Sequence, residues 1–309
     1  MGRCSMMRFL SRLLAIGCCV ALSGSASAEA RKVPKGSASA QLLDYAAAQK
    51  FMLALINRDR AKAGVSPVVL DDAASMAGLR HAQDITAKGF TGHIGTDGSV
   101  PEQRYTESGG VHFVQENAAC LFDGKARKLD RAPRFDPAKL AELQKMFMDE
   151  VPPKDGHRQN VLKPLHNRVG IGLAQPEGVN QPCLAQEFVD DYGSYDALPK
   201  EAKAKVKLRI AGSISEPLSF GGIGIGRTPL PTPKRVEEVS GARGYAIPAP
   251  AQMYFGPGFK TPKPVQVDGK RFSIDLELGA LRGQYAVSIW ARQGTGKLFM
   301  VSMRTVTVR

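Results

Sequence analysis

Two stretches of the chain place histidines among glycines and polar residues. The first runs from Phe90 to Asn117 (FTGHIGTDGSVPEQRYTESGGVHFVQEN) and contains His93, and the second runs from Asp155 to Leu162 (DGHRQNVL) and contains His157. Each stretch follows a run with helical periodicity, which is typical of sites whose side chains lie on loops of a rigid scaffold. Imidazoles in such a setting could act as acids and bases or ligate a metal.

A carboxylate lies near each histidine stretch. Glu116 belongs to a short apolar run, residues 111–121, which predicts a strand. Glu150 continues a helical face that starts at Pro137 and carries Leu140, Leu143 and Phe147. A carboxylate in register with a buried helix face must point at the interior or at a cavity, where it needs a partner.

The elements that position these side chains alternate between helices and strands. Helical periodicity predicts a helix over residues 41–64, and a second one from its N-cap, Asp71, to Gly89. Residues 67–70 predict a short buried link between them, and residues 168–174 and 183–189 predict two further strands. This order indicates a three-layer α/β/α domain.

The remaining parts of this half predict loops or packing. Residues 89–110 are expected to form a loop, and residues 123–137 a surface insertion of mixed charge. His81 lies on the small-residue face of the second helix, where a packed, hydrogen-bonded role is favoured over a ligand role. His112 and His166 are interpreted as surface or packing residues.

Residues 41–192 resemble the bacterial branch of the CAP superfamily, the cysteine-rich secretory, antigen 5 and pathogenesis-related (SCP-like) proteins. The resemblance is carried by motifs in the right order: Asn57-Arg58-Asp59-Arg60-Ala61 with Gly64, FTGHIGTDG with Arg104 and Gly109, QEN, GHRQNVL and RVGIGLA. It implies an α-β-α sandwich with a shallow groove lined by two histidines and two acids. Matched residue by residue, these groove residues are His93, Glu116, Glu150 and His157.

Two positions depart from the family pattern. The family's Gly-Glu-Asn is Gln115-Glu116-Asn117 here, and a tryptophan usual in the third helix is Phe147. Neither departure removes a groove side chain, so the implied groove is complete.

Three roles stay open for this quartet. It could hold a divalent metal such as zinc, with His93 and His157 as ligands, or act as a general acid and base pair. It could also be a structural network in which each carboxylate fixes a histidine tautomer. No serine, cysteine or threonine stands in a recognisable catalytic setting.

The resemblance favours a binding protein, because most family members are secreted binding or effector proteins, some carrying lipids or sterols. We therefore expect a non-catalytic groove for a lipid or other small apolar ligand, with no certain cofactor beyond a possible zinc or other divalent ion. A metal-assisted hydrolase and a structural envelope scaffold are the alternatives.

The first 28 residues predict a signal peptide. Arg3, Arg8 and Arg12 precede an apolar run over residues 13–22, and Ala26-Ser27-Ala28 offers a cleavage site. A lipidated Cys18 is the competing interpretation. No later run approaches the ~20 apolar residues of a transmembrane helix, so we expect an exported protein, periplasmic or secreted.

Two cysteines remain after cleavage, Cys120 and Cys183. In an oxidising compartment an even pair favours one disulfide over two free thiols. The bridge would tie the strand that follows Glu116 to the strand that precedes Phe188.

The C-terminal third carries nearly all of the net charge of +13. Residues 200–309 hold 18 Lys and Arg against 7 Asp and Glu, whereas residues 29–199 hold 21 against 22. The excess suits an anionic partner, and in an exported protein anionic cell-envelope components are favoured over nucleic acid. A merely soluble basic surface is the alternative.

Strand patterns fill the C-terminal third, at residues 207–214, 220–225, 271–278, 284–291 and 298–308. Tyr285, Val287 and Ile289 alternate inward, with Trp290 on the other face, and Gly222, Gly224 and Gly226 are interpreted as turns or a strand edge. The predicted fold class is α+β: a three-layer CAP sandwich at residues 41–198 and an antiparallel β-sandwich at residues 199–309. A flexible leader, residues 29–40, precedes them.

Overall fold

Four strands form the first sheet of the computed structural model, which describes residues 41–240 and 244–309. Their order is β1 (Val69–Leu70), β3 (Arg168–Ala174), β4 (Cys183–Asp190) and β2 (Phe113–Cys120). All eight residues of β4 are buried, because strands flank it and helices cover it on both faces. The predicted signal peptide, the leader, and Cys4, Cys18 and Cys19 lie outside the described residues.

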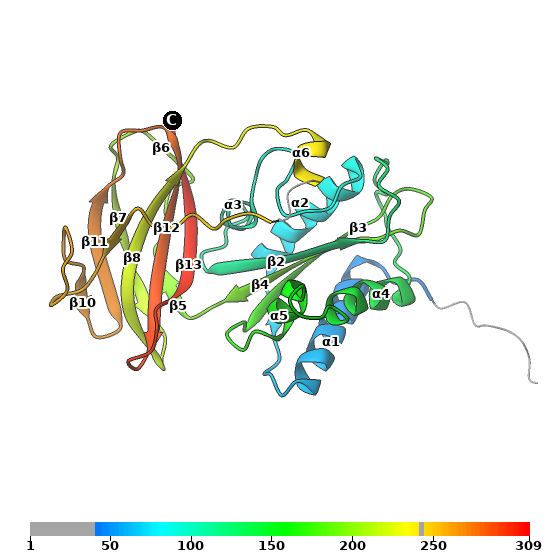
Figure 1. Ribbon diagram of the computed structural model, residues 1–309, viewed down its shortest axis with the longest axis horizontal. Helices are drawn as coiled ribbons and strands as arrows, with labels where there is room; N and C mark the ends of the chain where they lie inside the picture. The colour runs from blue at the N-terminus through cyan, green and yellow to red at the C-terminus, as the bar shows by residue number, and fades with distance from the viewer. Residues whose placement is uncertain (1–40, 241–243) are drawn as a thin grey trace, which may run out of the picture. The chain divides into compact units, whose positions relative to one another are not determined.

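Helices cover both faces of this sheet (Figure 1). On one face lie α1 (Tyr45–Lys62), α4 (Pro137–Met148) and α5 (Gly156–Leu162), and on the other lie α2 (Asp72–Lys88) and α3 (Pro101–Glu107). The predicted three-layer α/β/α arrangement is confirmed. None of the helices in the described ranges is long and apolar enough to cross a membrane.

The local sequence explains the ends of α2 and its close approach to the sheet. Asp71 caps the helix by accepting a hydrogen bond from the Ala74 N–H at 2.8 Å, and Gly89 ends it in the left-handed conformation. A Cβ on Gly172 would lie 2.0 Å from the Gly78 carbonyl carbon, so two glycines let helix and strand backbones touch. This packing sets the depth at which His81, one turn later, meets the sheet.

Two short helices that cover the first sheet were not predicted. Residues 101–107, expected to be loop, form α3, and the DGHRQNVL stretch forms α5 rather than a loop. A run of seven residues shows too few turns for its periodicity to be read, and burial between neighbouring elements stabilises these helices instead. The link at residues 67–70 is only partly buried, since Val69 is 55% exposed.

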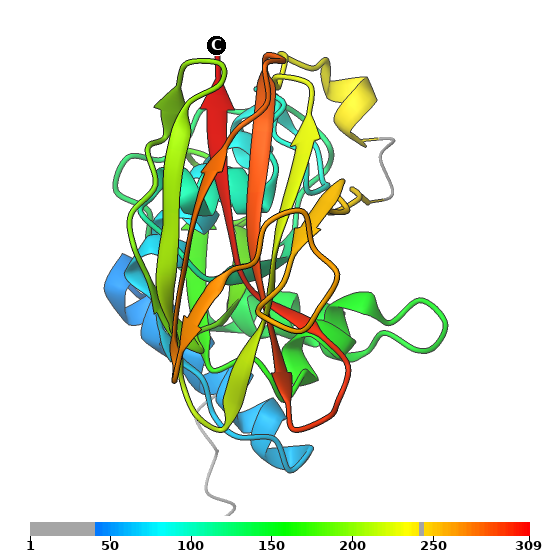
Figure 2. The same cartoon turned by 90° about the vertical axis from the view of Figure 1, so that its left-hand side faces the viewer.

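Two antiparallel sheets form the C-terminal region (Figure 2). One has the order β10 (Gln266–Asp268), β11 (Arg271–Glu277), β7 (Lys207–Ile214) and β5 (Gly193–Tyr195). The other has the order β6 (Glu201–Ala202), β13 (Phe299–Val308), β12 (Gly283–Gln293), β8 (Leu218–Thr228) and β9 (Gln252–Tyr254), with only β6 parallel to its neighbour. All five predicted strands are present, and Tyr285, Val287 and Ile289 lie in the apolar core between the sheets.

The second face of β12 and β13 is also covered, which the sequence pattern did not indicate. Ala286 and Met303 pack against Phe113 of the first sheet. The Ser302 hydroxyl donates to the Val111 carbonyl at 2.5 Å, and the Thr305 N–H donates to the Thr106 hydroxyl at 3.2 Å. The C-terminal strands therefore contact the elements that carry the histidine stretches.

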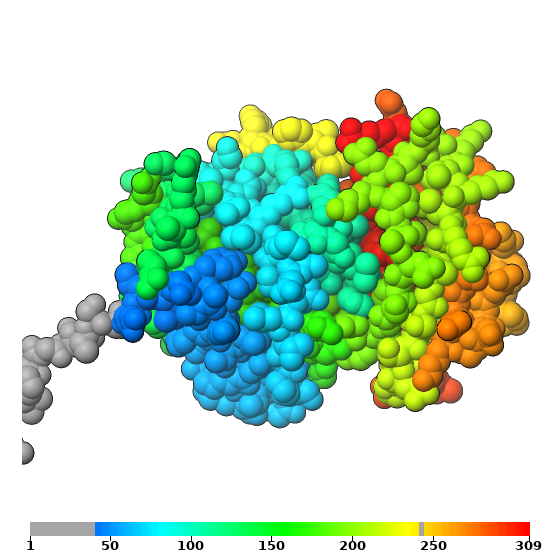
Figure 3. Space-filling model, turned by 180° about the vertical axis from the view of Figure 1, so that it is seen from behind, coloured from blue at the N-terminus to red at the C-terminus, as the bar shows by residue number. Residues whose placement is uncertain are grey.

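A chain segment between β8 and β9 runs back over the first sheet. We call residues 229–240 and 244–251 the crossing segment; it contains α6 (Val236–Ser240), seen in yellow in Figure 3. Gly222, Gly224 and Gly226 lie inside β8 and not in turns. Gly224 pairs with both β12 and β9, whereas Gly222 and Gly226 pair with β12 alone. A Cβ on Gly224 would lie 2.7 Å from the Pro250 side chain, so the glycines make room for the crossing segment.

Candidate functional site

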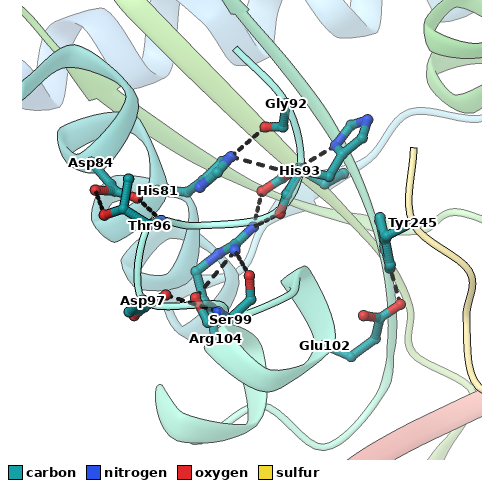
Figure 4. A network of polar contacts seen from close by, with 11 residues as sticks. His81, Asp84, Gly92, His93, Thr96, Asp97, Ser99, Glu102, Arg104 and Tyr245 are labelled. Carbon is teal, nitrogen blue, oxygen red and sulfur yellow. Dashed lines mark hydrogen bonds and ion pairs between the residues drawn. The ribbon is translucent and has the colours of Figure 1, made fainter. Parts of the chain in front are cut away.

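His93, Glu116 and Arg104 form one chain of charged contacts from three elements. The His93 Nδ1 lies 2.8 Å from Glu116 Oε1 on β2, and Arg104 Nη2 on α3 donates to Glu116 Oε2 at 2.7 Å (Figure 4). Arg104 also donates to the His93 carbonyl at 3.1 Å and to the Ser99 carbonyl at 3.0 Å. One buried guanidinium therefore fixes both the carboxylate and the loop that carries the histidine.

His81, on α2, also contacts this network. Its Nε2 donates to the Gly92 carbonyl at 2.7 Å and lies 3.6 Å from Glu116 Oε1. Burial and the nearby Arg104 charge lower the pKa of His81 to about 4, against the opposing pull of Glu116. His81 is neutral and packed, in agreement with the role expected from the sequence.

Glu150 and His157 form the second pair. Glu150 Oε1 lies 2.5 Å from the His157 Nδ1, and Glu150 Oε2 accepts the His157 N–H at 2.9 Å. The helical register prediction for Glu150 was wrong, because α4 ends at Met148 and Glu150 lies in the loop beyond it. The acid still meets its histidine because that loop turns directly into α5, and the Phe147 ring packs 4.9 Å from the imidazole.

The two pairs meet at one cavity, so the structure brings all four predicted residues together. The His93 and His157 ring centroids are 6.2 Å apart. The cavity, here called the groove, has a volume of about 450 Å³ and is lined by the four residues and by Gln115, Asn117, Lys154, Gly156, Asn160, Tyr245 and Ile247. Most of these side chains are polar.

The other histidines lie elsewhere, as expected. His166 is buried, with Nδ1 2.6 Å from Asp190 and Nε2 2.8 Å from the Asn160 side-chain oxygen. His112 lies 3.4 Å from Asp191. Both serve packing between elements.

Sequence reasoning missed two acids near the groove, Glu187 and Glu102. Glu187 lies opposite Glu116 in the β2–β4 ladder, and burial together with the neighbouring Glu116 carboxylate raises its pKa well above the ordinary value. Burial also opposes ionisation of Glu116, yet His81 and Arg104 hold the pKa of Glu116 well below its ordinary value. The opposite shifts favour the negative charge on Glu116 and the proton on Glu187.

Tyr245 and Glu102 form a further buried contact at the groove. The Tyr245 hydroxyl donates to Glu102 Oε1 at 2.9 Å, and its ring centroid lies 5.7 Å from that of His93. Burial raises the pKa of Glu102 to about 7, although the bond from Tyr245 favours the carboxylate. No local signal could join these residues, because 143 positions separate them in the sequence.

The donor set limits what metal the groove could hold. Among the described residues no group of three His, Cys, Asp or Glu side chains is arranged to hold a metal ion. Glu116 and Glu150 are turned toward the Nδ1 atoms, which leaves the two Nε2 atoms as donors. This does not fit a closed four-ligand zinc site, and only the two Nε2 atoms remain for an ion.

A disulfide joins β2 and β4, the strands that carry Glu116 and Glu187. Cys120 and Cys183 are bridged, at the end of β2 and the start of β4, so the predicted disulfide is confirmed. Ile85 and Phe90 pack beside it.

Comparisons with known proteins agree with this fold. Residues 53–188 match the model of the CAP family, described as the cysteine-rich secretory protein family. No curated protein matches the chain.

Solved structures show weaker likeness. An extracellular protein containing a SCP domain from Bacillus anthracis str. Ames aligns with a TM-score of 0.36 and 16% identity, over 47% of this chain and 40% of that one. An outer surface protein from Borrelia burgdorferi aligns with a TM-score of 0.36 and 14% identity, over 46% of this chain and 90% of that one. A chitin binding domain from Burkholderia pseudomallei aligns with a TM-score of 0.25 and 15% identity, over 36% and 57%. By the family match and by its three-layer fold, this chain carries a CAP domain at residues 53–188.

Proposed function

We propose that this is an exported binding protein whose groove holds a small ligand between His93 and His157 without turning it over. One observation carries the proposal: both Nδ1 atoms are tied to carboxylates, and both rings line the same cavity. A carboxylate that accepts the Nδ1 proton leaves Nε2 of a neutral imidazole as a lone-pair acceptor. Two such acceptors across one cavity suit a ligand with hydrogen-bond donors, or a divalent ion.

The polar lining favours a polar ligand over the apolar one expected from the sequence. Of the side chains that line the groove, only Ile247 and the Tyr245 ring offer apolar surface. Lipid chains need far more apolar area to be held against water.

Hydrolysis is the second candidate, because two carboxylate-bound imidazoles could activate water. The lining contains no serine, threonine or cysteine that could serve as a nucleophile, and Cys120 and Cys183 are bridged. Binding without turnover therefore has the stronger support.

Native mass spectrometry of the exported full chain tests the groove directly. We expect a bound small molecule or metal in the wild type, and its loss in the double variant H93A/H157A, which should remain folded. The variant His112→Ala serves as the matched control, since His112 is half-buried beside an acid but lies outside the groove. A bound mass that survives in H93A/H157A would contradict the proposal.

Zinc alone separates the metal version from a purely structural network. If His93 and His157 ligate zinc, calorimetry should show zinc stabilising the wild type and having no effect on H93A/H157A. If the quartet is only structural, the double variant should lose ~1 to 3 kcal/mol, mainly because the buried Glu116 Oε1 loses its partner, with no zinc effect on either protein.

The basic C-terminal region adds a second proposed role, attachment to an anionic surface of the cell envelope. The supporting observation is that successive cations along residues 203–209 (Lys203, Lys205, Lys207 and Arg209) are exposed. Full-chain protein should bind anionic vesicles more strongly than neutral ones. Binding should weaken with salt, because exposed charges are screened beyond ~8 Å at physiological ionic strength. Equal retention on both vesicles would remove this role.

A further inference from the structure

One wall of the groove comes from outside the region that matches the CAP family. Tyr245 and Ile247 line the groove, yet both belong to the crossing segment, more than 50 positions beyond residue 188. Whatever enters the groove meets these two side chains as well as the histidines.

The crossing segment is anchored on the loop between α2 and α3, and beside α2, before it reaches the groove. The Lys234 N–H donates to the Thr96 carbonyl at 2.8 Å, within the first histidine stretch. A Cβ on Gly98 would lie 2.4 Å from the Thr232 carbonyl oxygen, so the two backbones touch there. Val239 of α6 is buried beside Ile85 and the disulfide.

A second anchor follows the groove. Pro248, Ala249 and Pro250 lie over Gly224 and Gly226 of β8. The Ala251 N–H then donates to the Ile225 carbonyl at 2.9 Å. Ile247 packs with Phe113, Ala286 and Met303, so the residues just after Tyr245 are held by the sheet below.

Tyr245 itself is fixed at both ends of its side chain. Figure 4 shows it reaching from the crossing segment to Glu102, on the same side of the network as the His93 ring. The Tyr245 hydroxyl donates to Glu102 Oε1 at 2.9 Å, and the centroid of its ring lies 5.7 Å from that of His93. These contacts hold the ring in place at one side of the groove.

The histidine side of the groove is polar, and the side formed by Tyr245 and Ile247 is partly apolar. This combination limits the classes of ligand that the groove could bind. Each Nε2 can accept a hydrogen bond when Nδ1 donates its proton to the neighbouring carboxylate, while Tyr245 and Ile247 present a small apolar surface. Lys154 is the one Lys or Arg in the lining, too few for a nucleotide with several phosphates. A sugar ring combines hydroxyl donors on its edge with apolar C–H groups on its face.

We propose that the groove takes a saccharide, with one sugar ring packed against Tyr245 and its hydroxyls donating to the Nε2 atoms of His93 and His157. The inference rests on the proposed function, since it names the ligand class of the same groove. Tyr245 is then a residue that determines which ligands bind.

Titration of the full chain with soluble saccharides tests this, using a trisaccharide of N-acetylglucosamine, cellotriose and a trisaccharide of galacturonic acid as probes. Histidine ring NMR and calorimetry provide the two readouts. At least one probe should shift the ring signals of both His93 and His157. Tyr245→Ala should weaken that binding about tenfold, the order expected for loss of one aromatic contact.

Three further variants distinguish the loss of a ligand contact from a folding defect. Tyr245→Phe keeps the ring and loses only the bond to Glu102, so its affinity should stay within about twofold of wild type. Tyr245→Leu keeps apolar volume without a flat ring. It should bind as weakly as Tyr245→Ala while melting at the same temperature as Tyr245→Phe, which loses the same hydrogen bond. Phe259→Ala removes an exposed aromatic outside the groove, and should bind like wild type.

The outcomes separate this inference from the proposed function. If no saccharide shifts either histidine while zinc or a co-purified molecule still requires them, the saccharide assignment is overturned and the binding groove stands. Equal saccharide affinity in Tyr245→Ala and wild type also overturns it. If H93A/H157A binds every probe as wild type does, both proposals fail.

Discussion

The two sides of the groove use the same pair of side chains in opposite surroundings. On one side the Glu116 carboxylate is fully buried and Arg104, itself 1% exposed, binds it. On the other side Glu150 is 22% exposed and His157 is 32% exposed, and a backbone N–H is the added partner. The histidines are exposed to similar extents, 23% for His93 and 32% for His157, so the difference lies in the carboxylates: Glu116 belongs to the core, whereas Glu150 lies at the surface.

Replacing Glu116 should produce the largest effect and is the most direct way to break this comparison. Glu116→Gln removes the charge that balances Arg104, and a buried charge left without its partner costs ~3 to 5 kcal/mol of unfolding free energy. Urea unfolding measures the loss. Glu107→Gln, at an exposed ion pair with Arg80, is the control and should cost less than ~1 kcal/mol. Equal losses in the two variants would show that the buried pair is not special.

Removing the disulfide tests whether the bridge between β2 and β4 stabilises the His93 side of the groove more than the His157 side. The bridge joins residues 63 positions apart, and a loop of that size corresponds to ~4 kcal/mol in the chain-entropy model. The variant C120S/C183S should lose about that much by calorimetry. The ring signals of His157 should move less than those of His93, since Glu116 shares β2 with Cys120. Two reactive thiols in the unfolded, unreduced wild type would contradict the bridge itself.

The buried side should also respond to pH through Glu102. Burial raises its pKa from 4.5 to about 7, so the native state holds the proton more tightly than the unfolded state. The resulting stabilisation is fully present below pH 4.5 and is lost as the pH rises to about 7. Relative to Glu102→Gln, wild type should lose ~3 kcal/mol over this window.

Urea unfolding of both proteins between pH 4.5 and 8 measures that difference. His81, whose pKa is lowered to about 4, contributes the opposite slope between pH 4 and 6.5, but it is common to both proteins. A stability difference that does not change with pH would mean that Glu102 titrates normally.

Glu150→Gln should have the smallest effect on the unfolding free energy, and it tests the more exposed His157 side of the groove. The pair with His157 is partly solvated, so the loss of unfolding free energy should stay near ~1 kcal/mol or below. The same change should alter which His157 nitrogen carries the proton, which nitrogen chemical shifts would report. A loss as large as that of Glu116→Gln would make the two sides equivalent.

The sequence predicted the scaffold of the groove better than its surroundings. Strands of the C-terminal sheets and both long helices follow alternation or 3.6-residue periodicity, which depend on neighbouring residues alone. Glu150 was placed on the correct side for an incorrect reason, since α4 ends before it. Short helices such as α3 were not predicted, because seven residues show no clear helical period.

The missed groove residues depend on contacts between distant parts of the chain. Glu187 matters only because strand register sets it opposite Glu116, 71 positions away. Tyr245 reaches the groove because α6 and the β8 glycines anchor the crossing segment. A pattern that alternates Gly with Ile in β8 was visible in the sequence, but nothing in it indicated what lies on the glycines.

Substitutions at the glycines of β8 should disturb the groove, although these residues lie outside its lining. A methyl group at Gly224 would lie 2.5 Å from the Ser288 hydroxyl and 2.7 Å from the Pro250 side chain, so any substitution there must displace the crossing segment. A screen for loss of ligand binding should therefore recover changes at Gly224 together with changes at His93, although residue 224 does not line the groove. In laboratory evolution of this protein, the same strand offers a way to reposition Tyr245 without altering any residue that lines the groove.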